Sequence, residues 1–299
     1  MIYTVTCNPA LDYTIYVPAL TIGSIHRGVR DEITCGGKGI NVSTVLAELD
    51  LPTTALGFVG GFTGAELSWR LQEAGILCDF IEVEGDTRIN VKVRDGRETD
   101  INAAGPSVDD AAVEELIDKA KAAQAGDVLV LAGSIPAGIR RDLYERLCEN
   151  AAKCGVLTVV DAEGELLLGT LRHRPFLIKP NAEELGGLFH TQVSTAADVE
   201  YYARELQRRG AKNVLVSLGA EGALLVDETG VCHRMAPPSG TVVNTVGCGD
   251  SMVAGFLTGW IRTRSYTEAL RWGVACGSAT AFSATLATRE EIDAMIANL

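Results

Sequence analysis

Short apolar runs alternate with amphipathic stretches along the second half of the chain. Five runs have the length and β-branched content of buried strands: 128–133, 156–160, 175–178, 214–218 and 223–227. Residues 139–154 place Leu143 and Leu147 four positions apart, which predicts a helix. Strands that alternate with helices form βαβ units with right-handed crossovers. The pattern therefore predicts an α/β fold, a three-layer αβα sandwich around a mainly parallel, doubly wound sheet.

The first half of the chain has a different pattern. Charged and apolar residues alternate in four segments, at 12–17, 27–34, 87–93 and 98–102. This period is typical of strands in a sheet with one solvated face. Helix-like stretches at 39–49 and 62–74 interrupt the four segments. We expect one domain over residues 1–299, with the strands of a small β-sheet lid inserted at about 11–34 and 86–103.

Composition narrows the classes of function. The 299 residues include 26 Lys and Arg against 39 Asp and Glu, a net charge of −13, which argues against a nucleic-acid or anionic-membrane partner. A small anionic substrate needs only a few local cations and stays compatible. The sequence has no signal-peptide pattern and no apolar stretch approaching about 20 residues. It also lacks C-x-x-C pairs and paired histidines, so we expect a cytoplasmic protein without a zinc site.

The sharpest local motif is NTVGCGDSMVAGFLTGWI at 244–261. Gly247 and Gly249 bracket a tight turn, and an apolar helix pattern starts directly after Asp250. Backbone N–H groups at the start of a helix bind anions, and glycines allow a phosphate to approach closely. An acid beside such a site can accept a proton from an attacking hydroxyl. Taken alone, the motif fits a simple helix cap equally well.

Three weaker motifs also suit phosphate chemistry. CGGKGI at 35–40 places glycines around Lys38 at the start of a helix, but it matches neither a Walker A loop nor a dinucleotide fingerprint. In SLGAEG at 217–222, two strands joined through Gly219 and Gly222 could lay their backbone against a nucleotide, although an ordinary hairpin has the same pattern. KPNAEEL at 179–185 places Asn181 and Glu184 on one helix face, where oxygen ligands would suit Mg²⁺. In isolation, each of the three is more common as a solvated turn or a capped helix.

Taken together and in order, the motifs resemble those of the PfkB, or ribokinase-like, family of carbohydrate kinases. The resemblance covers nearly the whole chain, through NPALD (8–12), GGKGIN (36–41), GFVGGFTG (57–64), GSIP (133–136), KPNAEE (179–184), SLGAEG (217–222) and TVGCGDSMVAGF (245–256). TRINVKV (87–93) and ETDINAAGP (98–106) are most similar to the branch that phosphorylates ketohexose phosphates. The resemblance implies a kinase that uses ATP and Mg²⁺ and acts on fructose 1-phosphate, with tagatose 6-phosphate as the alternative substrate.

The resemblance also implies roles for individual residues. Asp250 would be the catalytic base, and the backbone amides of Gly247, Cys248 and Gly249 would stabilise the transferred phosphoryl group. Asn181 and Glu184 would hold Mg²⁺ through water. The ATP contacts would come from Lys179, Asn181, Ser217, Gly219 and Gly222. The sugar contacts would come from Asp12, Gly37, Asn41 and Asn90, and the contacts to its phosphate from Arg27, Lys38 and Arg88.

Several alternatives remain open. A kinase for unphosphorylated sugars or nucleosides would not need the three cations on and near the lid, and a non-catalytic sugar-phosphate sensor would not need Asp250. A Rossmann oxidoreductase would need the fingerprint that is missing. The family habit of pairing lids suggests a homodimer. One departure from the family pattern is Cys248, where alanine is usual; a thiol at a helix start can have a lowered pKa and raised reactivity.

Overall fold

A ten-stranded sheet forms the centre of the protein in the computed structural model, which describes residues 1–136 and 138–299. Its order is β14-β13-β12-β11-β10-β9-β1-β4-β5, with β6 also paired to β4. Neighbours from β12 to β5 are parallel, whereas the β12–β13 and β13–β14 pairs are antiparallel. The strands are β1 Ile2–Thr6, β4 Thr53–Val59, β5 Leu77–Cys78, β6 Ile81–Glu82, β9 Val128–Ala132, β10 Leu157–Asp161, β11 Leu177–Ile178, β12 Asn213–Ser217, β13 Ala223–Val226 and β14 Cys232–Met235.

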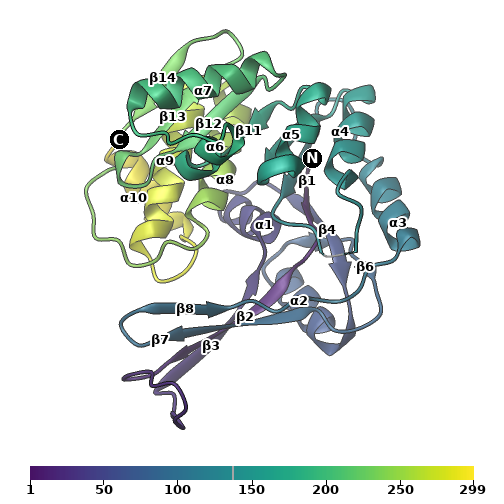
Figure 1. Ribbon diagram of the computed structural model, residues 1–299, viewed down its shortest axis with the longest axis vertical. Coiled ribbons are helices and arrows are strands. Elements are labelled where there is room, and N and C mark those ends of the chain that lie inside the picture. The colour runs from purple at the N-terminus through teal and green to yellow at the C-terminus, as the bar shows by residue number, and fades with distance from the viewer. Residues whose placement is uncertain (137) are drawn as a thin grey trace.

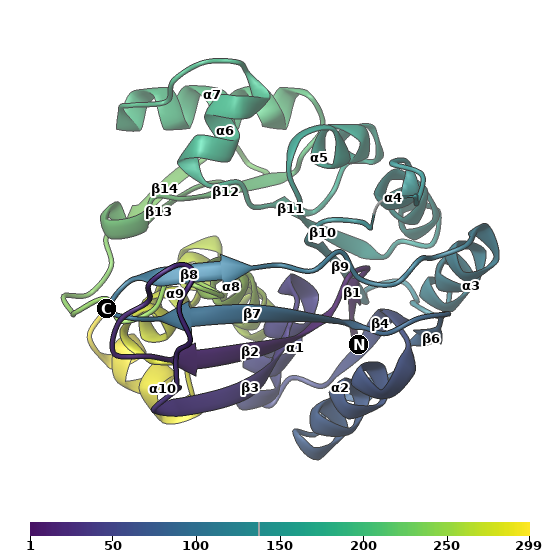
Figure 2. The ribbon, with the colours of Figure 1, turned by 60° about the horizontal axis from the view of Figure 1, so that its bottom comes forward.

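Helices cover both faces of this sheet (Figures 1 and 2). Val130 and Leu131 are neighbours on β9 and point to opposite faces, so each belongs to a separate buried cluster. One cluster includes α3 Asp110–Ala120, α4 Leu143–Lys153, α5 Gly164–Thr170, α6 Ala182–Leu188 and α7 Ala196–Arg208. The other includes α1 Lys38–Glu48, α8 Cys248–Thr263, α9 Tyr266–Phe282 and α10 Arg289–Ala297. The predicted three-layer αβα sandwich is confirmed.

A separate four-stranded sheet projects from one side of the sandwich (Figure 1). Its order is β3-β2-β7-β8, with bounds β2 Ala10–Tyr16, β3 Arg30–Gly36, β7 Arg88–Arg94 and β8 Glu98–Ile101. These strands correspond to the four segments of alternating pattern, so the small sheet is confirmed. Helix α2 Gly61–Glu73 packs through Leu67 and Leu71 into a third buried cluster, which also contains Leu11 from β2. This cluster fixes the root of the small sheet on the sandwich.

Some boundaries differ from the prediction. The helix expected at 139–154 begins at Leu143, because a turn in which the Leu143 N–H bonds the Arg140 carbonyl precedes it. The strand expected at 175–178 contains only Leu177 and Ile178, since Pro175 has no N–H to give to a sheet. Within the described residues, none of the helices combines the length and apolar character that a membrane crossing requires.

Candidate active site

The strongest sequence motif forms the beginning of helix α8. Gly247 is the N-cap residue, with a φ of 80° that glycine adopts readily. A Cβ at this position would lie 2.5 Å from Leu286 Cδ2, so a larger residue would have to displace that side chain as well as adopt the positive φ. Among the described residues no side chain caps the helix. The first N–H groups of α8, including those of Cys248 and Gly249, therefore remain available to an anion.

Asp250 lies in the first turn of α8 and is almost completely buried, with 5% of its surface exposed. Its Oδ2 accepts a hydrogen bond of 2.8 Å from Nδ2 of Asn41 on helix α1. The GGKGIN and GCGD motifs, which are 209 residues apart at this contact, thus meet at one carboxylate. A carboxylate that only capped the helix would accept from backbone N–H groups of α8 instead.

A second buried acid, Asp161, lies beside this pair at the carboxyl end of strand β10. Its Oδ1 is 3.1 Å from the ammonium of Lys38, and its Oδ2 is 3.3 Å from the ammonium of Lys179. Asp161 is not among the residues predicted from the motifs, although the sequence carries a signal: an acidic residue directly follows the apolar run VLTVV. The carboxyl ends of parallel strands are where open α/β sheets build their sites.

The two acids differ in charge state. Burial, to which the nearby charge of Asp161 adds, raises the pKa of Asp250 to about 6, against the opposing effects of Asn41, Lys179 and Lys38. Burial alone would also raise the pKa of Asp161, but the ammonium groups of Lys179 and Lys38 hold it below its usual range. Environments that separate the pKa values of two acids are typical of acid–base sites. Asp250 is therefore suited to exchange a proton, whereas Asp161 stays charged and positions two lysines.

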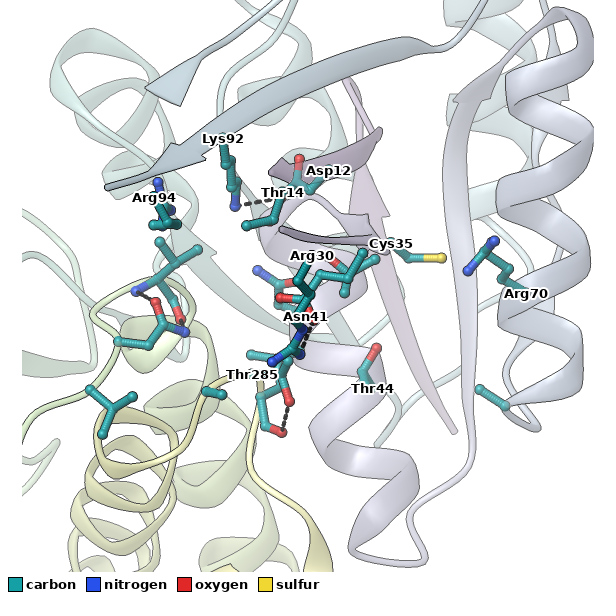
Figure 3. Close-up of a pocket in the computed structure, with 18 of the residues that line it drawn as sticks. Asp12, Thr14, Arg30, Cys35, Asn41, Thr44, Arg70, Lys92, Arg94 and Thr285 are labelled. Atoms are coloured by element: carbon teal, nitrogen blue, oxygen red, sulfur yellow. Dashed lines mark hydrogen bonds and ion pairs between the residues drawn. The ribbon is translucent and has the colours of Figure 1, made fainter. Parts of the chain in front are cut away.

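A cavity of about 790 Å³ lies between the small sheet and the sandwich (Figure 3). Asp12 and Lys92 enter it from β2 and β7, and Asn41 enters it from α1 (Figure 3). Asn41 also bonds Asp250, so it connects the cavity to the buried carboxylate. The volume is typical of a small-molecule site.

Asp12 is the centre of a polar cluster on the wall that the small sheet provides. Its Oδ1 accepts a hydrogen bond of 2.8 Å from Asn90, and its Oδ2 is 2.7 Å from the ammonium of Lys92. Gly36 makes room for this carboxyl group, because a Cβ there would lie 2.7 Å from it. Asp12 and Asn90 were predicted site residues, but Lys92 was missed. The available signal was its place two residues after Asn90 on a strand, which points both side chains to the same face.

The three cations predicted to bind the sugar's phosphate are placed differently from one another. Arg27 is exposed in the loop between β2 and β3, outside the strands. Lys38 is paired with Asp161, and Arg88 donates hydrogen bonds to the carbonyls of Asn8 (3.1 Å) and Ala103 (3.3 Å). Among the described residues the cations that line the cavity are instead Arg30, Arg70, Lys92 and Arg94.

The predicted ATP and metal residues lie close to one another at the carboxyl edge of the sheet. A β-bridge joins Asn181 to Ser217, and Gly219 and Gly222 have positive φ values in the turn that follows. Asn181 caps α6: its Oδ1 accepts from the Glu184 N–H, and Glu184 Oε2 accepts from the Asn181 N–H, both at 2.8 Å. This capping box leaves one oxygen of Glu184 uncommitted. Within the described residues no group of three or more His, Cys, Asp or Glu side chains could hold a metal.

Two further residues predicted from the motifs are Gly37 and Cys248. Gly37 has a φ of 123°, and a Cβ there would lie 2.6 Å from Thr6 Cγ2, so it lets α1 begin close to β1. The pKa of Cys248 is raised rather than lowered. Burial, to which the nearby charge of Asp250 adds, raises this pKa to about 11.

Comparison with known proteins relates nearly the whole chain to carbohydrate kinases. The family model "pfkB family carbohydrate kinase" matches residues 6–292. A 1-phosphofructokinase of Bacillus subtilis is 43% identical over 99% of this chain and 97% of its own, and a D-tagatose-1-phosphate kinase of Bacillus licheniformis is 38% identical over 98% and 96%. Phosphofructokinase-2 of Escherichia coli, solved with substrates and products, has a TM-score of 0.94 and 32% identity over 99% of this chain and 98% of its own. The same enzyme has been solved with fructose 6-phosphate and in a tetrameric inhibited form. The chain belongs to the pfkB family of carbohydrate kinases.

Proposed function

We propose that this protein transfers a phosphoryl group from ATP to fructose 1-phosphate and so forms fructose 1,6-bisphosphate. The observation that carries the proposal is the buried carboxylate of Asp250, which lies at an uncapped helix start and contacts the cavity through Asn41. The names of the relatives support the choice of sugar. A sugar-phosphate sensor would gain nothing from a buried acid whose pKa is raised.

The residues of the site fit the steps of phosphoryl transfer. Asp250 accepts the proton of the sugar hydroxyl while the hydroxyl oxygen forms a bond to the γ-phosphorus of ATP. At the same time the bond between that phosphorus and the oxygen of the leaving ADP breaks. The N–H groups around Gly247, Cys248 and Gly249 stabilise the charge on the transferred group, typically by a few kcal/mol per donor. Lys38 and Lys179, which Asp161 holds in place, supply positive charge beside the same helix start.

The Mg²⁺ that accompanies ATP needs little from the protein. Mg²⁺ keeps several waters and is often bound by substrate phosphates with one or two carboxylates. The uncommitted oxygen of Glu184 suits a contact through water. The two capping bonds between Asn181 and Glu184 orient α6 beside Ser217, where ATP would bind.

A comparison of substrates tests the proposal. We expect fructose 1-phosphate to give the highest kcat/KM in an ADP-release assay, ahead of fructose 6-phosphate and free fructose. Tagatose 1-phosphate is the second candidate, because the tagatose kinases among the relatives are named for the 1-phosphate rather than for the 6-phosphate first considered. A higher kcat/KM for either tagatose phosphate would make that sugar phosphate the preferred substrate. A preference for unphosphorylated sugars would contradict the proposed function.

The raised pKa of Asp250 predicts an acid limb in the pH profile. A base must be ionised, so activity should be full above a pKa of about 6 and should fall as the pH drops through that value. The measurement is kcat against pH at saturating substrates.

Substrate phosphates also titrate near this pH, and a variant separates the two causes. Asn41→Leu removes the hydrogen bond that lowers the pKa of Asp250, so its acid limb should move to higher pH. If titration of the substrates causes the acid limb, Asn41→Leu should show it at the same pH as the wild type. That outcome would show that Asp250 does not cause the limb.

The lid also predicts an assembly. Ile22 and Ile25 are 97% and 93% exposed in the loop between β2 and β3, and Ile101 on β8 is 62% exposed. Exposed apolar surface on a projecting sheet is a common feature of protein–protein interfaces. We expect a homodimer through the lid, measured by light scattering after size exclusion. The Ile22→Glu, Ile25→Glu double variant should be a monomer, whereas a wild type that is monomeric at micromolar concentration would refute the assembly.

A further inference from the structure

A second cavity, of about 710 Å³, lies at the edge of the sheet opposite the candidate active site. Arg174 precedes β11 and Lys212 precedes β12, and both line this cavity. Lys179 follows β11 and Ser217 ends β12, and both belong to the candidate active site. Because β11 and β12 are parallel, their amino ends share one edge and their carboxyl ends the other. In Figure 1 the helix α7 beside this cavity lies far from the lid strands.

The charge of the cavity is opposite to that of the chain. Its charged lining residues are four cations and one carboxylate: Arg174, Arg204, Arg208, Lys212 and Glu228. The whole chain carries a net charge of −13. Oε1 of Glu228 accepts a hydrogen bond of 2.6 Å from the hydroxyl of Tyr266, and the four cations outnumber this one carboxylate. The cavity is therefore a local concentration of positive charge.

Two of these cations lack a protein partner. Arg204 pairs with Glu200 at 2.9 Å, and Arg208 pairs with Glu205 at 2.6 Å. Across residues 1–136 and 138–299, no carboxylate lies within 4.0 Å of the Arg174 guanidinium or the Lys212 ammonium. Two like charges that line one cavity without acceptors repel each other, so an anion between them would be favoured.

The walls of the cavity are fixed before any ligand arrives. Nε2 of Gln207 donates to the carbonyls of Lys212 (2.9 Å) and Asp227 (2.6 Å), which ties α7 to both neighbouring segments. Gly210 has a φ of 137°, and a Cβ there would lie 2.0 Å from the carbonyl oxygen of Leu171. Only glycine lets the end of α7 approach the short helix η1 Leu171–His173, which Arg174 follows. This close approach brings Arg174 to the same cavity as Lys212.

The helix dipole of α7 accounts for only part of the arrangement. Basic residues at a helix end complement the dipole, which is sufficient for Arg208. Arg174 and Lys212 come from other segments. In addition, the last carbonyls of α7 already have backbone partners, so they do not need these cations. The Glu205 carbonyl accepts the N–H of residue 209, the Leu206 carbonyl that of residue 211, and the Gln207 carbonyl that of residue 210.

We propose that this cavity binds the phosphate group of a small molecule at a site separate from the substrates. Arg174 offers a planar fork that matches two phosphate oxygens, and Lys212 adds a compact charge. The inference goes beyond the proposed kinase activity and does not depend on it.

Calorimetric titration at low ionic strength tests this site, with inorganic phosphate, pyrophosphate and ribose 5-phosphate as separate probes. The Arg174→Ala, Lys212→Ala double variant should lose one binding event that the wild type shows, or weaken it at least tenfold. The control is the Lys121→Ala, Lys153→Ala variant, which removes the same charge from surface ion pairs at the end of α3 and on α4. It should bind as the wild type does.

Each outcome has a clear meaning. Loss confined to the cavity variant supports the site, and the probe that binds most tightly distinguishes free phosphate from a phosphorylated metabolite. Identical titrations of the cavity variant and the wild type would overturn the proposal, as would equal losses in the cavity variant and the control. The kcat of the cavity variant should equal that of the wild type, which shows that the fold and the active site are intact.

Discussion

Asp250→Asn should lower kcat by about two orders of magnitude or more, the usual contribution of a general base. The substitution keeps the size of the side chain and its contact with Asn41, but it removes the proton acceptor. The affinity for ATP should change little, because the backbone N–H groups of α8 are untouched. The measurements are kcat from ADP release and the dissociation constant of ATP from calorimetry.

The chain offers a matched control for this variant. Asp198 occupies the same position of α7, three residues after the N-cap, and there it does cap the helix by accepting the Thr195 N–H at 2.9 Å. Asp198→Asn should leave kcat unchanged. If Asp250→Asn retains most of its turnover, the carboxylate is not the base, and an effect shared by both variants would indicate a loss of helix stability instead.

Lys92→Met should raise the KM for the sugar phosphate at least tenfold and leave the KM for ATP unchanged. Lys92 is 9% exposed and holds the carboxylate of Asp12 at 2.7 Å on the cavity wall. Removing one partner of a buried ion pair leaves the other uncompensated, so the free energy of unfolding should also fall by about 3 kcal/mol. Steady-state kinetics with the other substrate saturating and denaturant unfolding measure the two effects.

Arg97→Met is the control for this variant, in the turn between β7 and β8. Arg97 forms an ion pair with Asp95 at 2.7 Å outside the cavity; its own side chain is 77% exposed, and Asp95, which is 6% exposed, also accepts the N–H groups of Leu20 and Arg97. A solvated guanidinium contributes little to such a pair, and Asp95 keeps its other partners. The control should match the wild type in both measurements. Equal effects of Lys92→Met on the KM of both substrates would place Lys92 in lid closure rather than in sugar binding.

The sequence predicted those parts of the fold that depend on local pattern. Half-exposed strand patterns located the four strands of the small sheet, and short apolar runs located β9, β10, β12 and β13. Boundaries were less accurate where a single turn decides them, as at Leu143 and Pro175. The pairing order of the main sheet came from no local pattern, because it depends on contacts between segments far apart in the chain.

In the candidate site, too, residues within a local motif could be predicted from the sequence, and residues whose role depends on distant partners could not. Glycine-rich motifs marked Asp250 and Asn41, since glycine is required wherever the backbone approaches other groups closely. Asp12 was marked by NPALD through the family resemblance. Asp161 and Lys92 carry no such local mark, and their roles depend on partners that the fold supplies. The raised pKa of Cys248 is likewise not visible in the sequence, because the helix start is local whereas the burial that raises the pKa is tertiary.

The most direct test of the account is to identify the product by phosphorus NMR. With ATP and fructose 1-phosphate, the account predicts fructose 1,6-bisphosphate and ADP in equal amounts, with both missing from Asp250→Asn. ADP with inorganic phosphate and unchanged fructose 1-phosphate would contradict it, as would a bisphosphate that forms only from fructose 6-phosphate.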